Sequence, residues 1–151
     1  MKTIPLKSSK NILDIGTGSG CIILSILRDR NKCYANALDI SAKALKVAKS
    51  NAKIQQVSNR IRFIKSDVDK FLTGKYDLII SNESGPTKGI IKRKDAVHIC
   101  YCLTPMRYIW DMRNTYLKKL NFIERIIAKI TFSYLRKWDI KTSKSIDEIA
   151  V

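Results

Sequence analysis

The sequence is poor in acidic residues and histidine, and it contains no long apolar run. It has 13 Asp and Glu against 29 Lys and Arg, a single His, and a net charge of +16 over 151 residues. Because a membrane-spanning helix needs about 18 or more consecutive apolar residues, none is predicted. Residues 1–10 also lack the apolar run and small-residue cleavage site of a secretion signal.

The cysteines do not form a metal-binding pattern. Cys21, Cys33, Cys100 and Cys102 include no C-x-x-C pair, and His98 is the only histidine that could complete a zinc site. No metal site is therefore expected, and we interpret His98 as a packing residue rather than a catalytic base. Unpaired thiols without a secretion signal are typical of the reducing cytoplasm, which is the predicted location.

The basic charge has two interpretations. Both halves of the chain carry an excess of Lys and Arg, so nucleic acid is a possible partner. The basic residues are scattered rather than clustered, which favours the view that Lys is simply the usual surface residue here.

Short apolar runs alternate with helical patterns along the first half of the chain. The expected strands are residues 11–15, 34–38, 61–64 and 76–81, and the expected helices are residues 21–27 and a segment that begins after Ser41, a plausible N-cap. This alternation predicts a single α/β domain with a Rossmann-like, doubly wound, mainly parallel sheet and helices on both faces.

The second half has a different pattern of apolar and basic residues. A fifth strand is expected at residues 97–103, one long amphipathic helix at about 114–137, and a short helix near 145–150. The long helix has an apolar stripe and many basic residues. We favour a core-facing helix with a solvated basic face, and the alternative is a helix that lies on an anionic membrane.

A glycine-rich turn joins the first strand to the first helix. It runs from Asp14 to Gly20 (D-I-G-T-G-S-G), where glycine lets a ligand approach the main chain and the helix offers free N–H groups. Asp39 ends the second strand, where nucleotide-binding sheets place an acid for ribose hydroxyls. Asp67 follows the third strand, where a carboxylate could accept a hydrogen bond from an adenine amino group.

The glycine spacing distinguishes two possible ligands. Gly16, Gly18 and Gly20 alternate with other residues, whereas the dinucleotide pattern G-x-G-x-x-G separates its last two glycines by three positions. The spacing favours S-adenosylmethionine (SAM), and NAD is the alternative.

Three strings between residues 11 and 82 carry a family resemblance. They are I-L-D-I-G-T-G-S-G-C from Ile12, A-L-D-I-S from Ala37 and Y-D-L-I-I-S-N from Tyr76. They resemble the release-factor glutamine methyltransferases. The resemblance implies a class I, SAM-dependent methyltransferase whose acceptor is a glutamine side chain of a protein.

The same resemblance implies a set of cofactor-binding residues. The glycines would line the methionine and ribose of SAM, Asp39 would hold the ribose, Asp67 would lie near the adenine, and Asp14 would fix the loop and the methionine amino group. The full implied set is Asp14, Gly16, Gly18, Gly20, Asp39 and Asp67.

Asn82 is the candidate catalytic residue. In the resembled family this Asn begins the motif Asn-Pro-Pro-Tyr and helps to position the substrate glutamine amide. Here Glu83, Ser84 and Gly85 follow instead, and we expect no counterpart of the family's N-terminal helical substrate-binding domain. We therefore expect Asn82 to work poorly without the rest of the motif.

A second resemblance begins at about Asp77. The strings H-I-C-Y-C from His98, T-P-M-R-Y-I-W-D from Thr104 and L-R-K-W-D from Leu135 are similar to the N-terminal acceptor domain of GT-B glycosyltransferases, which use a nucleotide sugar. The resemblance implies an acceptor-side half without sugar transfer of its own. Four of its residues would either contact an acceptor or pack the loop: Tyr101, Arg107, Tyr108 and Trp110.

The two resemblances meet at residues 76–82 and predict a hybrid chain, whether a natural fusion, an assembly artefact or a design. Residues 1–82 would be a SAM-methyltransferase-like half, and residues 83–151 a glycosyltransferase-like half that completes the sheet. The alternatives to methyl transfer are a fragment of a glycosyltransferase and a non-enzymatic basic domain that binds nucleic acid.

Overall fold

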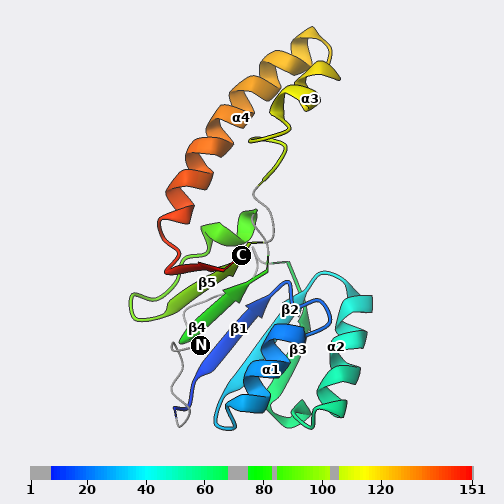
Figure 1. Ribbon diagram of the computed structural model, residues 1–151, viewed down its shortest axis with the longest axis vertical. Helices are drawn as coiled ribbons and strands as arrows, with labels where there is room; N and C mark the ends of the chain where they lie inside the picture. Colours follow the sequence, from blue (N-terminus) through cyan, green and yellow to red (C-terminus); the bar gives the residue numbers. More distant parts are fainter. Residues whose placement is uncertain (1–7, 68–74, 83–84, 103–105, 151) are drawn as a thin grey trace.

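The computed structural model describes residues 8–67, 75–82, 85–102 and 106–150, which form one six-stranded sheet with helices beside it (Figure 1). Every strand pair is parallel, and the strand order is β3-β2-β1-β4-β5-β6. The strands are β1 Asn11–Ile15, β2 Tyr34–Asp39, β3 Ile61–Lys65, β4 Leu78–Ser81, β5 Val97–Tyr101 and β6 Glu148–Ala150. The predicted Rossmann-like, mainly parallel sheet is confirmed.

Two helices cover one face of this sheet. α1 (Cys21–Asp29) and α2 (Ala42–Ile54) follow β1 and β2, and Ser41 caps α2 as predicted by accepting a hydrogen bond from the Ala44 N–H at 3.2 Å. Their apolar sides share one buried cluster with the strands, which includes Ile12, Ile23, Leu24, Leu27, Ala52 and Ile80. The alternate strand residues Leu13, Ile15, Leu38 and Ile79 form a second cluster on the opposite face.

The strand order brings the ends of β1, β2 and β4 together. β1 lies between β2 and β4, so the chain must pass from β3 at one edge back across the sheet to β4. In parallel sheets a ligand site forms at the carboxyl ends of the strands where the order reverses in this way. The loop after β1 and Asn82 after β4 meet at that point.

The second half departs from two of the predictions. The predicted single long helix is wrong, because the chain forms α3 (Arg113–Lys118) and α4 (Phe122–Ser143) with a break between them. Asn121 Oδ1 accepts a hydrogen bond from the Glu124 N–H at 2.9 Å, and Glu124 Oε2 accepts one from the Asn121 N–H at 3.0 Å. This reciprocal pair starts a new helix at a position that the apolar spacing does not reveal.

The short helix predicted near residues 145–150 is also wrong, because Glu148–Ala150 form β6 instead. β6 pairs with β5, whose backbone groups would otherwise lie at an open sheet edge. Asp147 aligns the two strands: its Oδ2 accepts from the His98 N–H at 2.7 Å, and its own N–H donates to the His98 carbonyl at 3.0 Å.

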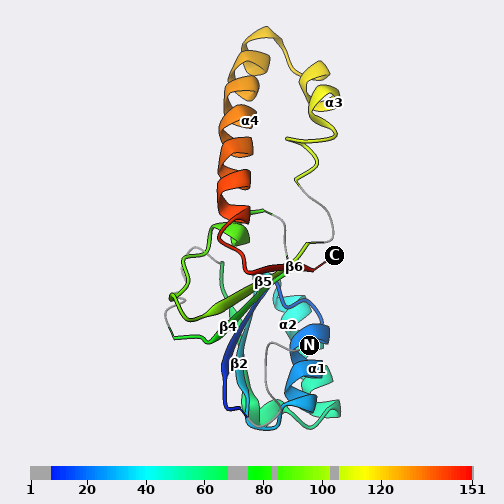
Figure 2. The same ribbon diagram turned by 60° about the vertical axis from the view of Figure 1, so that its left-hand side comes forward.

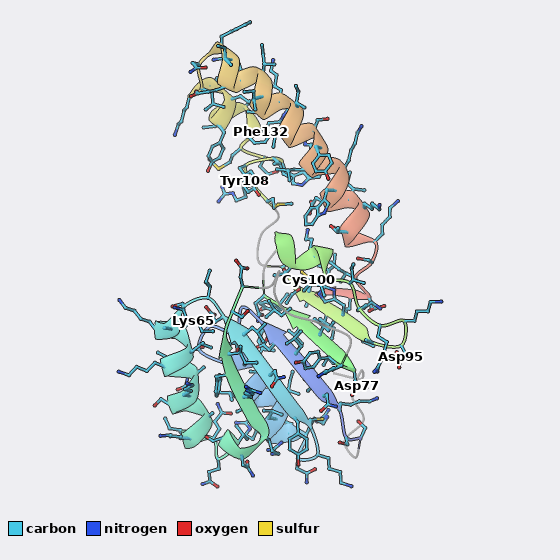
Figure 3. All side chains as sticks on the ribbon, turned by 180° about the vertical axis from the view of Figure 1, so that it is seen from behind. Lys65, Asp77, Asp95, Cys100, Tyr108 and Phe132 are labelled. Carbon is cyan, nitrogen blue, oxygen red and sulfur yellow. The ribbon has the colours of Figure 1, made fainter. Side chains whose placement is uncertain are left out.

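α3 and α4 form a hairpin that projects beyond the carboxyl ends of the strands (Figures 1 and 2). The favoured interpretation of a core-facing helix is wrong: Ile123, Ile127 and Ile130 of α4 are 60–69% exposed. The helix turns its other side toward α3 and the preceding loop, where the rings of Tyr108 and Phe132 lie 6.3 Å apart (Figure 3).

A buried ion pair attaches the base of the hairpin to the sheet. Lys88, in the short helix η3 (Pro86–Gly89), lies 2.8 Å from Asp139 of α4, and both side chains are buried. Trp110 Nε1 donates to the second oxygen of Asp139 at 2.9 Å, and the Arg136 guanidinium stacks over the Trp110 ring at 4.6 Å. Tyr108 and Trp110 both pack against α4, which is one of the two roles considered for them, and contact with an acceptor stays a prediction.

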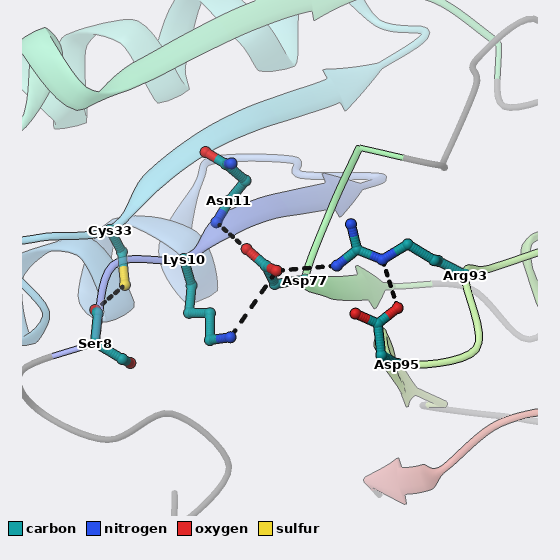
Figure 4. Close-up of polar contacts among 7 residues, drawn as sticks. All are labelled: Ser8, Lys10, Asn11, Cys33, Asp77, Arg93 and Asp95. Atoms are coloured by element: carbon teal, nitrogen blue, oxygen red, sulfur yellow. Dashed lines mark hydrogen bonds and ion pairs between the residues drawn. The ribbon is translucent and has the colours of Figure 1, made fainter.

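Polar contacts also connect the two halves at the other end of the strands (Figure 4). Asp77 accepts from the N–H of Asn11, the first residue of β1, at 2.8 Å, and pairs with Lys10 at 3.9 Å. It also pairs with Arg93 at 3.1 Å, and Arg93 in turn bonds Asp95. Asp77 therefore links the start of β1 to the loop between β4 and β5.

Replacing Lys88 by Met is expected to lower the free energy of unfolding by about 3 kcal/mol, because the buried Asp139 carboxylate loses its cation. Urea denaturation measures this change. Lys10→Met is the matched control, since its pair with Asp77 is long and exposed and its loss costs about 0.5 kcal/mol or less. The double variant Lys88→Met/Asp139→Leu should recover most of the stability, and equal losses for Lys88→Met and Lys10→Met would contradict the anchoring role.

Candidate functional site

The loop after β1 has a backbone that only glycine adopts readily. Gly16, Gly18 and Gly20 have φ angles of 72°, 56° and 81°, all in the left-handed region. A Cβ on Gly20 would lie 2.9 Å from Leu24 Cδ1, so close packing of α1 also requires glycine there. A Cβ on Gly18 would meet nothing within 4 Å, which shows that the space above this residue is open.

The loop is held by β2 and α2. The N–H groups of Gly16 and Thr17 both donate to the Leu38 carbonyl at 2.9 Å, and the Asn51 side chain donates to the Ser19 carbonyl at 2.9 Å. The loop is therefore fixed in shape without a ligand. The part played by Asn51 was not assigned from the sequence, because its partner is a backbone carbonyl 32 residues earlier.

Asp39, at the end of β2, lies against the loop. Its Oδ2 accepts from the Gly18 N–H at 2.8 Å, and its Oδ1 accepts from the Ser41 N–H at 2.8 Å. Each carboxylate oxygen has a second lone pair, so the half-buried side chain still has acceptor capacity for two ligand hydroxyls. The contact between Asp39 and the glycine loop is present in the structure, and the predicted role of Asp39 in holding a ribose stays a prediction.

Asp14 lies beneath the loop, almost entirely buried at 1% exposure. Asn82 Nδ2 donates to its Oδ1 at 3.0 Å, and Asn82 itself lies against Gly16. Burial raises the pKa of Asp14 from 3.8 to about 6, and the negative charge of Asp39 adds to this effect, while the nearby Thr17 hydroxyl and the Asn82 amide oppose it in part.

Three buried side-chain oxygens at this point have no hydrogen-bond partner among the described residues. They are Asp14 Oδ2, Thr17 Oγ1 and Asn82 Oδ1, and the Thr17 hydroxyl is close enough to the Asp14 carboxyl to lower its pKa. Buried polar atoms are nearly always paired, because an unpaired one loses its hydration without compensation. N–H donors of bound molecules, above all a cationic group beside Asp14, would satisfy the acceptors of Asp14 and Asn82. The sequence predicted Asp14 and Asn82 separately as site residues, but it did not predict the hydrogen bond between them.

Two other residues named from the sequence lie outside this cluster. Asp67 is exposed and follows β3, so it lies at the same carboxyl ends of the strands as the loop, but β2 separates β3 from β1. Its place near an adenine stays a prediction. His98 is fully buried on β5, with Nε2 3.0 Å from Ser81 Oγ. Burial lowers the pKa of His98 to about 4, and the residue packs inside the sheet as we interpreted it.

Comparison with known proteins agrees with this geometry. The family model "Methyltransferase small domain" matches residues 1–87. The chain is 46% identical over 76 residues to the release factor glutamine methyltransferase of Lactococcus lactis, which covers 50% of this chain and 27% of that protein. It is 48% identical over 73 residues to a bifunctional methyltransferase of Rickettsia typhi, covering 48% of this chain and 14% of that protein.

A solved structure supports the fold. A putative methyltransferase from Thermoplasma acidophilum has a TM-score of 0.54 at 23% identity, over 62% of this chain and 44% of that chain. The present chain spans about a quarter or less of the curated relatives named above. The predicted likeness of residues 11–82 to SAM-dependent methyltransferases is confirmed.

Asp14→Asn is expected to stabilise the protein without ligand. A buried acid with a raised pKa holds its proton more tightly in the folded state, so wild type loses stability as the pH rises from about 4 through about 6. A shift from 3.8 to about 6 corresponds to roughly 3 kcal/mol at pH 8. Urea denaturation of both proteins between pH 5 and pH 8 should show the variant more stable, with a difference that narrows toward pH 5.

The exposed Asp29, at the end of α1, provides the control, because Asp29→Asn makes the same chemical change outside this cluster. A constant difference between Asp14→Asn and wild type across this pH range would mean that Asp14 does not titrate as described.

Proposed function

The chain belongs to the methyltransferase small domain family, and on that premise we propose that its glycine loop binds SAM and that its methyl acceptor is a protein glutamine side chain. The proposal that the loop binds SAM rests on one observation. The loop from Gly16 to Gly20, whose three glycines have left-handed φ angles, lies between the carboxylates of Asp14 and Asp39. When bound, SAM supplies an electrophilic methyl group on a sulfonium.

The charge of the site supports SAM over NAD. The chain carries far more basic than acidic residues, yet Asp14 and Asp39 both lie at this loop. Carboxylates favour a ligand with ammonium and sulfonium charges, and they would repel a pyrophosphate. The Asp14 carboxylate lies beside the Thr17 hydroxyl and has acceptor capacity that suits the ammonium, while Asp39 has acceptor capacity for the ribose hydroxyls.

Asn82 suits the acceptor side of the reaction. Its Nδ2 is committed to Asp14, which fixes the plane of the amide, and its Oδ1 is left to accept a hydrogen bond. A glutamine amide that donated to this oxygen would be held beside the glycine loop. Residues 83–85 differ from the Pro-Pro-Tyr of the resembled family, so we expect this chain alone to transfer slowly.

Isothermal titration with SAM tests the cofactor. Wild type should bind, and Asp39→Ala should bind at least tenfold more weakly because the ribose hydroxyls lose their acceptor. Gly18→Ala should bind equally poorly, since its Cβ would occupy the open space above the loop. Asp29→Ala serves as the matched control, and thermal unfolding of each variant shows that it is folded. If the folded wild-type protein does not bind SAM, the proposed function is wrong.

A methyl-transfer assay tests the acceptor. Mass spectrometry of a release-factor-like peptide should show slow gain of one methyl group on its glutamine, and no gain when that glutamine is replaced by glutamate. Asn82→Ala should abolish the transfer, because Asn82 Oδ1 is the proposed amide acceptor. If wild type binds SAM but never methylates the peptide, the acceptor is not this glutamine, and the cofactor proposal stands by itself.

The other functions considered stay predictions. Residues 83–151 supply β5, β6 and the α3–α4 hairpin, and their likeness to a glycosyltransferase acceptor half rests on sequence strings alone. Binding of nucleic acid rests on the net charge.

A further inference from the structure

The outer side of α4 presents a continuous stripe of apolar residues to solvent. They recur at helical spacings of three and four, so they share one side of the helix. Their exposed fractions are 78% for Phe122, 69% for Ile123, 47% for Ile126, 60% for Ile127, 68% for Ile130 and 67% for Tyr134.

These residues are not what holds the hairpin together. The side of α4 that packs carries Phe132 against Tyr108, the Arg136 guanidinium over Trp110, and Asp139 in its buried ion pair. Both views of the fold show the hairpin standing clear of the sheet, with its outer side uncovered (Figures 1 and 2). An uncovered apolar stripe of this length on a surface helix indicates a binding surface.

Basic residues accompany the stripe, and the acids of α4 are engaged elsewhere. Glu124 is held in the capping pair with Asn121, and Asp139 is buried against Lys88. The exposed cations on and beside the helix are Lys118, Lys119, Arg125, Lys129, Lys137, Lys141 and Lys144. The surface therefore combines exposed isoleucines with positive charge, and its partner must be apolar and anionic at once.

We propose that the outer side of α4 docks onto an anionic phospholipid membrane. Its isoleucines and Phe122 would enter the boundary between headgroups and acyl chains, and the lysines would meet the lipid phosphates, as in amphipathic helices that lie in a membrane surface. No helix in the described part of the chain is long and apolar enough to cross a bilayer, so the binding is peripheral.

Other partners fit the surface less well. A second copy of this chain would bring another net charge of +16 against the same basic surface. A nucleic acid would match the lysines but would leave the isoleucine stripe in water. This surface is independent of the cofactor site, because it lies on the projecting hairpin rather than on the loops after β1 and β4.

Sedimentation of the full chain with lipid vesicles tests the proposal. Vesicles that contain phosphatidylglycerol should bind the protein at least tenfold more tightly than vesicles of phosphatidylcholine alone, and added salt should weaken the binding. The double variant Ile127→Asp/Ile130→Asp should bind at least tenfold more weakly. Its matched control is Val47→Asp/Ile54→Asp, which changes exposed apolar residues of α2 and should bind as wild type does.

A spectroscopic readout separates insertion from simple charge attraction. Tyr134→Trp places an indole in the stripe, and its fluorescence should shift to the blue on phosphatidylglycerol vesicles but not on phosphatidylcholine vesicles. Thermal unfolding shows whether each variant is folded, which is expected because the changed side chains are exposed.

Three results would overturn the proposal. Equal binding by wild type and Ile127→Asp/Ile130→Asp would show that the stripe plays no part. Equal loss in the α2 control would show a general effect of added acid. Absence of vesicle binding, with a dimer in size-exclusion chromatography that Ile127→Asp/Ile130→Asp dissociates, would make the stripe a self-association surface.

Discussion

The parallel alignment of β1 between β2 and β4 is the constraint on which the candidate site depends. Because the strands run the same way, the ends of β1, β2 and β4 lie side by side, and each has a polar residue of the site at its end or next to it: Asp14, Asp39 and Asn82. The Leu38 carbonyl at the end of β2 then accepts from two N–H groups of the loop after β1. If β1 occupied any other position, Asp14, Asp39 and Asn82 would not converge.

The same alignment explains why the site lowers the stability of the folded protein. Asp14 belongs to the buried middle of the sheet, and its carboxyl must share that space with Asn82 and with no cation among the described residues. Burial of an acid in this way opposes ionisation, which is why its pKa is near 6. A residue that weakens the fold in the absence of ligand and suits a cationic ligand is typical of a binding site rather than of a structural contact.

The second half of the chain is joined to the first by pairing and by charge. β5 pairs with β4 and β6 with β5, so the backbone hydrogen bonds of the sheet continue across the boundary between the two halves. The ion pair between Asp77 and Arg93 adds an ionic link between the two halves, while the pair between Lys88 and Asp139 holds the hairpin within the second half. The hairpin beyond them has its own packing and leaves an apolar side uncovered, which is the least expected feature of the molecule.

The sequence by itself determined the first four strands, the two helices between them, and the glycine loop with Asp39 after the next strand. Local patterns suffice there, because apolar runs, an N-cap and a glycine-rich turn act over a few neighbouring residues. The tertiary structure decided the rest. The helical spacing of apolar residues continues across Asn121, so it did not reveal the break between α3 and α4. It also could not predict which side of α4 is covered, because that depends on contacts with residues far away in the sequence. Residues 148–150 became a strand because the edge of β5 was open to pairing, and the contact between Asp14 and Asn82 arose because β4 lies beside β1.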